Sequence, residues 1–264
     1  MKPTPKHRSE KPKKPFVPVA ASKPAAPAAA AAKPEYPMRI NKYLALKGHS
    51  TRRGADELIA KRAVTINGRR AVLGDKINEG DSVQVAAKAK PVRYEYYAFN
   101  KPAGVVTHSA QKGEKDISSV VKRIDLFPIG RLDKESDGLI IMTNDGRITD
   151  RLLNPKYEHE KEYSVSTKMK LRNNFKERME GGVVIDEEVT KPCKVNVTSD
   201  HSFKVILGEG KKHQIRRMCS ALFNEVSTLR RTRIMNIELG GLAAGHMRML
   251  KGEELATFLK SLGL

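Results

Sequence analysis

The stretch GRLDKESDGLIIMTNDG, from Gly130 to Gly146, decides the fold of the larger part of this 264-residue chain. Two β-like runs, 129–133 and 138–143, flank a short polar turn, and a second turn at 144–146 precedes a helical pattern. Asp133 is therefore expected at the end of a strand, outside the core. A carboxylate placed there can react with a substrate, cap a turn or form a salt bridge of little consequence.

Strand and helix patterns continue on both sides of this stretch. Apolar residues that alternate predict strands, and apolar residues three or four apart predict helices. The predicted strands are 93–99, 160–166, 183–185, 194–198, 203–207, 226–229 and 233–239, and the predicted helices begin near 116, 148, 171, 210 and 252. We expect one α+β domain over 93–264, with a mixed, mostly antiparallel sheet flanked by helices.

A smaller unit is predicted at 38–86. Two short helices, the first ending near Gly48 and the second capped by Ser50 or Thr51, precede strands at 64–66 and 82–85. Twelve Lys and Arg side chains against five Asp and Glu lie between residues 38 and 90, an excess of seven positive charges. Such an excess on a small fragment indicates a polyanionic partner, although a charge run of this kind is often a solvated helix face.

The remaining segments and the overall charge narrow the class of protein. Residues 1–37 are rich in Pro, Ala and Lys and are predicted to be a disordered basic tail, either RNA-concentrating or merely solubilising, and 87–92 is a predicted linker. The net charge of +20 favours nucleic acid over a membrane surface. No run suits a membrane span, and Cys193 and Cys219 lack the spacing of a zinc site or disulfide framework, so we expect a soluble, cytoplasmic protein.

Four side chains are candidates for chemistry: Asp133, Arg131, Tyr163 and Arg216. An ionised carboxylate can attack an electrophilic sugar carbon without a partner base if a nearby cation holds it in place. A tyrosine offers a ring on which a displaced base can stack. The helix after Gly210 is predicted to bury Ile215 and to turn Gln214 and Arg216 away from the core.

Several ordered motifs resemble those of known RNA-modifying proteins. Residues 38–86 resemble the S4 RNA-binding module, through MRINKYLA (38–45), STRR (50–53), VTING (64–68) and Gly80-Asp81. NKPAG (100–104), GRLD (130–133) with Gly138-Leu139, TNDG (143–146), KEY (161–163) and EGKKHQIRRM (209–218) look like the motif set of the RsuA-type ribosomal RNA pseudouridine synthases. The two resemblances together cover about residues 38–260.

The resemblance implies a role for each matching residue. Asp133 matches the catalytic aspartate, Tyr163 the active-site tyrosine and Arg216 the basic partner of the aspartate, while Arg131 matches the arginine that helps to hold a flipped nucleotide. The implied substrate contacts are Arg131, Ile215, Lys101 and Lys211. The implied RNA contacts of the S4-like module are Arg39, Lys42, Arg52, Arg53, Lys61 and Arg62. The implied reaction moves uracil from an N1 to a C5 linkage on the ribose and needs no metal or organic cofactor.

Two features refine the expected target. Ser136 stands where threonine is frequent in the family, and LRRTRIMN (229–236) lacks the glycine that often follows Arg-Ile in the family's sequences. The latter, with HEKEY (159–163), looks more like the pseudouridine synthase F branch. We therefore expect a monomer acting on ribosomal RNA, 23S rather than 16S, with a pre-ribosomal particle and tRNA as further candidates. Two alternatives stay open: a non-catalytic S4-type RNA-binding or ribosome-assembly protein, and a glycosidase that releases uracil from RNA.

Overall fold

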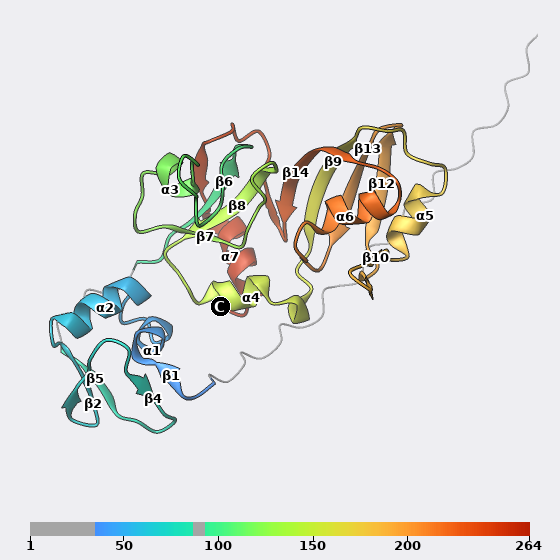
Figure 1. The fold of residues 1–264 in the computed structure, drawn as a ribbon. Helices are drawn as coiled ribbons and strands as arrows, with labels where there is room; N and C mark the ends of the chain where they lie inside the picture. Colours follow the sequence, from blue (N-terminus) through green and yellow to red (C-terminus); the bar gives the residue numbers. More distant parts are fainter. Residues whose placement is uncertain (1–34, 87–92) are drawn as a thin grey trace, which may run out of the picture.

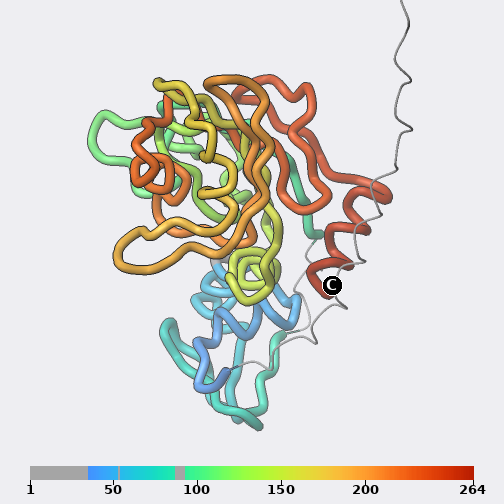
Figure 2. Tube along the Cα trace, turned by 90° about the vertical axis from the view of Figure 1, so that its right-hand side faces the viewer, coloured from blue at the N-terminus to red at the C-terminus, as the bar shows by residue number. Residues whose placement is uncertain are grey.

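The computed structural model describes residues 35–86 and 93–264, so the predicted basic tail, but for its last three residues, and the predicted linker lie outside it. The described residues have separate hydrophobic cores, one in the small N-terminal unit and three in the large C-terminal unit. In both views the small unit lies below the large one, with α1 and α2 on the side toward it (Figures 1 and 2). In the described part of the chain no helix is long and apolar enough to cross a membrane.

The small unit packs two helices against short strands. Its elements are β1 (Met38–Arg39), α1 (Ile40–Leu46), α2 (Arg52–Ala60), β2 (Val64–Ile66), β3 (Arg69–Arg70), β4 (Lys76–Ile77) and β5 (Val83–Val85). Thr51 caps α2, because its hydroxyl accepts a hydrogen bond from the backbone nitrogen of Gly54 at 3.1 Å. Ile40, Leu44 and Ile59 of the two helices are buried with Val64 and Ile66 of β2.

The large unit is built around one nine-stranded sheet. Seven strands lie in the order β12-β13-β9-β14-β8-β6-β16, with β7 paired to β8 and β15 to β14. The strands are β6 (Tyr96–Lys101), β7 (Phe127–Ile129), β8 (Asp137–Thr143), β9 (Lys161–Thr167), β12 (Lys194–Ser199), β13 (Ser202–Leu207), β14 (Val226–Ile234), β15 (Ile237–Glu238) and β16 (Met247–Met249). Among the paired strands of this sheet in the described residues, only β14 and β8 run parallel, which confirms the predicted mixed, mostly antiparallel sheet.

The helices cover the two halves of the sheet differently. They are α3 (Ile117–Val120), α4 (Ile148–Leu153), η1 (Pro155–Tyr157), α5 (Phe175–Glu180), α6 (Gln214–Ala221) and α7 (Gly252–Ser261), with a separate hairpin of β10 (Val184–Ile185) and β11 (Glu188–Val189). Around β6 and β8 both sheet faces are covered, one by α4 and α7 and the other by α3, so these strands are almost continuously buried. Around β9 and β13 one face packs against α5 and α6, so buried and more exposed residues alternate along the strands (Figure 1).

The two halves join where β14 pairs with β8. At this junction Arg231 lies opposite Gly138, whose φ is +106°. A Cβ on Gly138 would overlap the backbone oxygen of Arg231 and would lie 2.7 Å from its nitrogen. Because only glycine permits both this φ and this approach, Gly138 fixes the spacing of the two halves just after the Asp133 loop.

Exchanging Gly138 for Ala is expected to destabilise the protein by at least about 2 kcal/mol, since the new methyl group forces β8 and β14 apart at a strained φ. Thermal or denaturant unfolding measures the change. The matched exchange Gly241→Ala, at a glycine with ordinary φ and open space around a Cβ, should alter stability by less than about 0.5 kcal/mol. A fully stable Gly138→Ala protein would contradict the close junction.

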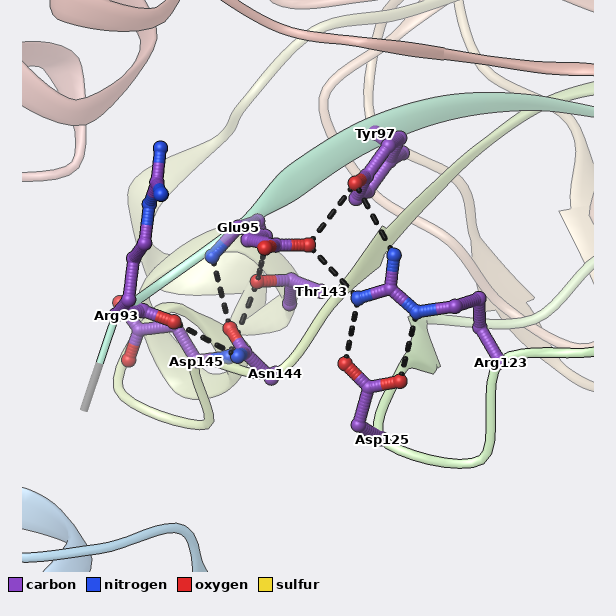
Figure 3. Close-up of polar contacts among 8 residues, drawn as sticks. All are labelled: Arg93, Glu95, Tyr97, Arg123, Asp125, Thr143, Asn144 and Asp145. Carbon is purple, nitrogen blue, oxygen red and sulfur yellow. Dashed lines mark hydrogen bonds and ion pairs between the residues drawn. The ribbon is translucent and has the colours of Figure 1, made fainter. Parts of the chain in front are cut away.

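The TNDG motif anchors the start of the large unit. The side chain of Asn144 donates to the carbonyl of Arg93 at 3.0 Å and accepts from the backbone nitrogen of Glu95 at 2.9 Å, and Thr143 Oγ1 donates to the carbonyl of Glu95 at 2.6 Å. Figure 3 shows these contacts beside a second group, in which Arg123 joins Glu95, Tyr97 and Asp125. The motif therefore fixes the point where the chain enters the sheet, and does so away from the pocket described below.

Some predicted element bounds were wrong. The first β-like run ends at Ile129, so 130–133 belongs to a loop and not to a strand. The runs 226–229 and 233–239 are not separate strands, because β14 continues through Arg230–Thr232. Helix α5 begins at Phe175 and α6 at Gln214, each later than predicted, and β16 was missed.

Candidate active site

A cavity of about 450 Å³ lies on the large unit where the Asp133 loop, β9, β14 and the start of α6 meet. Its wall includes Asp133 from the loop, Tyr163 from β9 and Ile215 from α6. Leu132, Tyr163 and Ile215 belong to one buried apolar cluster, which gives the wall its rigid backing. The remaining charged side chains of the wall are Arg131, Lys161, Glu209, Lys211, Lys212, His213 and Arg231.

The Asp133 loop, residues 130–136, is held from both sides. Thr107 Oγ1 donates to the carbonyl of Leu132 at 2.8 Å and accepts from its nitrogen at 3.1 Å, and Gly104 N donates to the carbonyl of Lys134 at 2.7 Å. The Ser136 nitrogen closes a turn onto the Asp133 carbonyl at 3.0 Å. Within the loop these bonds use only backbone atoms of 132–136, so the Asp133 carboxylate does not cap the turn.

The carboxylate of Asp133 is half-buried and faces His213. The distance from Asp133 Oδ1 to His213 Nε2 is 3.5 Å. His213 has a left-handed backbone, with φ +52°, and directly precedes α6. The loop before it is fixed by a hydrogen bond between two buried side chains, in which the Gln214 amide nitrogen donates to Glu209 Oε1 at 2.6 Å. Gln214 is therefore buried, contrary to the sequence-based expectation, because it ties the loop to the helix.

Arg216 does not form the predicted ion pair with Asp133. Its guanidinium lies beside the same loop but contacts the Ser136 hydroxyl at 3.3 Å and the carbonyls of Glu135 and Val226 at 3.5 and 3.4 Å. All three distances exceed those of ordinary N–H···O bonds, so the side chain is held loosely. The prediction placed Arg216 in the correct corner of the fold but with different partners.

The predicted substrate contact of Lys101 does not fit its position. The side chain is fully buried, and its Nζ donates to the carbonyls of Val105, Pro102 and Lys134 at 2.7, 3.0 and 3.4 Å. Burial lowers the pKa of Lys101 to about 8, yet three acceptors around three N–H groups suit the ammonium form. Lys101 thus braces the NKPAG turn against the Asp133 loop from beneath and cannot reach an incoming nucleotide.

The other predicted substrate contacts lie at the cavity. Arg131 is exposed on the wall, and Ile215 is buried in it. Lys211 also lines the cavity, but its Nζ forms an ion pair with Glu188 Oε2 of β11 at 2.5 Å. A phosphate group that binds Lys211 therefore shares its ammonium with Glu188 or displaces this carboxylate.

Comparison with known proteins assigns this arrangement to a family. Residues 95–221 match the family model "RNA pseudouridylate synthase", and residues 38–83 match the S4 domain. The chain is 40% identical over 233 residues to the dual-specificity RNA pseudouridine synthase RluF of Escherichia coli K12, covering 86% of this chain and 80% of that protein. The chain belongs to the RNA pseudouridine synthases.

Two further relatives agree with the RsuA-type assignment. The ribosomal large subunit pseudouridine synthase B of Bacillus subtilis is 33% identical over 231 residues, which cover 82% of this chain and 93% of that protein. A solved pseudouridylate synthase structure superposes with a TM-score of 0.62 at 28% identity, over 85% of this chain and 99% of that chain. The similarity to RluF places this pseudouridine synthase near the RluF branch, as its motifs predicted.

The S4 domain of this synthase exposes its predicted RNA contacts. Arg39, Lys42, Arg52, Lys61 and Arg62 are all exposed, and none forms an ion pair with another described residue. The side chain of Arg53 lies outside the described structure. An exposed set of unpaired cations matches the prediction of phosphate contacts, which stays a prediction.

Five charged residues of the synthase pocket were not chosen from the sequence: His213, Lys161, Arg231, Glu209 and Lys212. His213 and Lys161 lie inside quoted motifs, next to residues that were chosen. Arg231 lies in a segment interpreted as a gap between strands. Burial, followed by the charge of Arg231, lowers the pKa of Lys161 to about 8.

Proposed function

We propose that this enzyme converts a uridine of large-subunit ribosomal RNA to pseudouridine, with Asp133 as the nucleophile. The observation that carries the proposal is the meeting of Asp133, Tyr163 and Ile215 in one cavity of about 450 Å³. This volume suits a single nucleoside unit drawn out of its stack. The carboxylate is half-buried at the wall, open to a ligand and not used by the fold.

Each residue has a distinct part in the proposed reaction. Asp133 attacks C1′ of the ribose, or removes a proton from the sugar in the variant mechanism, while Tyr163 stacks on uracil and assists removal of the C5 proton. Arg216 contacts Ser136 in the loop that also carries Asp133, and from this position it stabilises the negative charge of the Asp133 carboxylate. Arg131, at the rim, helps to hold the extruded nucleotide. Neither metal nor organic cofactor enters these steps.

Similarity to two relatives supports the choice of RNA. One is named a ribosomal large subunit synthase and the other, RluF, a dual-specificity RNA synthase. We therefore place 23S-type RNA before 16S and include tRNA as a candidate second substrate. A monomeric state and a cytoplasmic location stay predictions.

The test is to incubate the protein with unmodified 23S, 16S and tRNA transcripts and to map pseudouridine along each. We expect one new pseudouridine in the large-subunit RNA. Modification confined to 16S RNA would contradict the target, and RNA binding with no modification of any RNA would favour the non-catalytic S4-type alternative. Free uracil would instead indicate the glycosidase.

A further inference from the structure

Arg231 is the most unusual charged residue of the pocket. Its side chain lines the cavity, yet only 4% of the residue is exposed. Nε donates to the carbonyl of Leu139 at 2.6 Å, across the junction of β14 and β8. The guanidinium carbon lies 6.0 Å from the centroid of the Tyr163 ring, on which the uracil is proposed to stack.

This buried cation lacks the partner that such a group requires. Nη2 has no hydrogen-bond partner among the described residues, and no described carboxylate lies within ion-pair distance of Arg231. Its neighbours on β14 differ: Arg230 pairs with Asp137, and Arg233 pairs with Glu160 and Glu162. Because a buried donor without an acceptor is costly, its persistence in a pocket indicates an acceptor supplied by a ligand.

A purely structural role accounts for only part of these contacts. The bridge between the two halves of the sheet uses only Nε of Arg231, so the fold does not require the two terminal nitrogens of the guanidinium. The same wall holds Lys161, whose Nζ donates to the carbonyl of His159 at 2.9 Å and which has no carboxylate partner among the described residues. Two cations without carboxylate partners therefore share the wall with Tyr163, where the base is expected.

The proposed reaction creates a negative charge at that place. When an oxygen of Asp133 forms a bond to C1′, the C1′–N1 bond breaks and its electron pair passes to uracil, where it spreads over N1, O2 and O4. The base then carries one negative charge until C5 bonds to C1′ and the electron pair of the C1′–O bond returns to Asp133. Loss of the C5 proton and gain of a proton at N1 complete the isomerisation without a further reactant.

We propose that Arg231 donates a hydrogen bond from a terminal nitrogen of its guanidinium to a carbonyl oxygen of the uracil and, with Lys161, stabilises the departing base as an anion. The inference rests on the proposed function. It makes Arg231 a catalytic residue that acts on the leaving group, at the opposite end of the breaking bond from Asp133. A preorganised, buried donor is suited to this task.

The test compares leaving groups. Single-turnover cleavage of the C1′–N1 bond is measured on one RNA that carries either uridine or 5-fluorouridine at the target, because fluorine itself stabilises the uracil anion. Because Arg231→Met removes one such donor, we expect the variant to cleave the C1′–N1 bond of uridine about 100-fold more slowly than the wild type. On 5-fluorouridine the loss should be at least tenfold smaller, with RNA affinity changed less than about threefold.

Arg230→Met is the matched control, since it removes the same charge from the adjacent residue of β14 outside the pocket. It should change neither rate by more than about threefold. Circular dichroism checks the fold, and if Arg231→Met is unfolded, Arg231→Lys, which keeps the charge but not the fork, replaces it with the same expected pattern. Equal losses on the two RNAs, or no loss, would overturn the inference. A wild-type protein that modifies no RNA would refute the proposed function itself.

Discussion

Asp133→Asn is expected to lower the rate of pseudouridine formation by at least about 10³-fold, which corresponds to about 4 kcal/mol of lost transition-state stabilisation. The amide has the shape of the carboxylate but is a far weaker nucleophile toward a sugar carbon. The measurement is a single-turnover rate on large-subunit RNA at saturating enzyme. RNA affinity should stay within about threefold, because no step of binding requires the carboxylate.

The same exchange should leave the fold intact. The Asp133 side chain is half-buried, and its only ion pair among the described residues is the 3.5 Å contact to His213, so we expect stability to change by less than about 0.5 kcal/mol. Glu135→Gln, two residues along the same loop, is the matched control and should retain wild-type activity, since its side chain is exposed and lies off the cavity. An active Asp133→Asn enzyme would remove Asp133 from the mechanism.

Deleting residues 38–86 is expected to weaken RNA binding at least tenfold and to flatten its dependence on salt. Each phosphate contact contributes about 0.7–0.9 to the slope of log affinity against log salt, so loss of several contacts should lower that slope by about 3 or more. Fluorescence anisotropy over a range of salt concentrations measures both quantities. The large unit has its own cores and should keep its melting transition.

A full-length variant separates the effect of losing the positive charges from the effect of losing the whole domain. Replacing Arg39, Lys42, Lys61 and Arg62 with Gln should reproduce most of the change in slope, because these side chains are exposed and have no ion-pair partners among the described residues. Replacing Lys251 and Lys260, at the opposite end of the chain, should alter it far less. If the truncated protein binds equally well at every salt concentration, the S4 domain does not contact the RNA.

The sequence predicted the location of Asp133 and Tyr163 because their setting follows simple periodicities. Alternation along β9 places Tyr163 on the buried face with Val165. The short polar turn before Gly138 indicated that Asp133 lies outside the core, although its strand ends earlier than predicted, at Ile129. Helical spacing likewise placed Ile215 inward. The order and spacing of the motifs then indicated that these three residues share one site, and all three line the same cavity.

The sequence could not predict which cations would be buried. The resemblance implied that Lys101 contacts substrate, and the apolar pattern left Arg231 in a break between two strands. Because lysine and arginine are almost never fully buried, nothing in the sequence indicated that either side chain is enclosed. Lys101 is instead enclosed by three carbonyls, and Arg231 lies inside the continuous strand β14. Both positions depend on contacts between segments far apart in the chain. Arg216 shows the same limit, because helical spacing does not specify which oxygen its guanidinium meets.

Tritium release from large-subunit RNA labelled at C5 of uridine tests the central claim most directly. Isomerisation through C5 must expel the hydrogen on that carbon, whereas binding or simple glycosidic cleavage leaves it on the base. The account predicts one equivalent of tritium per modified uridine with wild-type protein, none with Asp133→Asn, and no free uracil from either. Absence of tritium release from every RNA supplied, or release of uracil in its place, would contradict it.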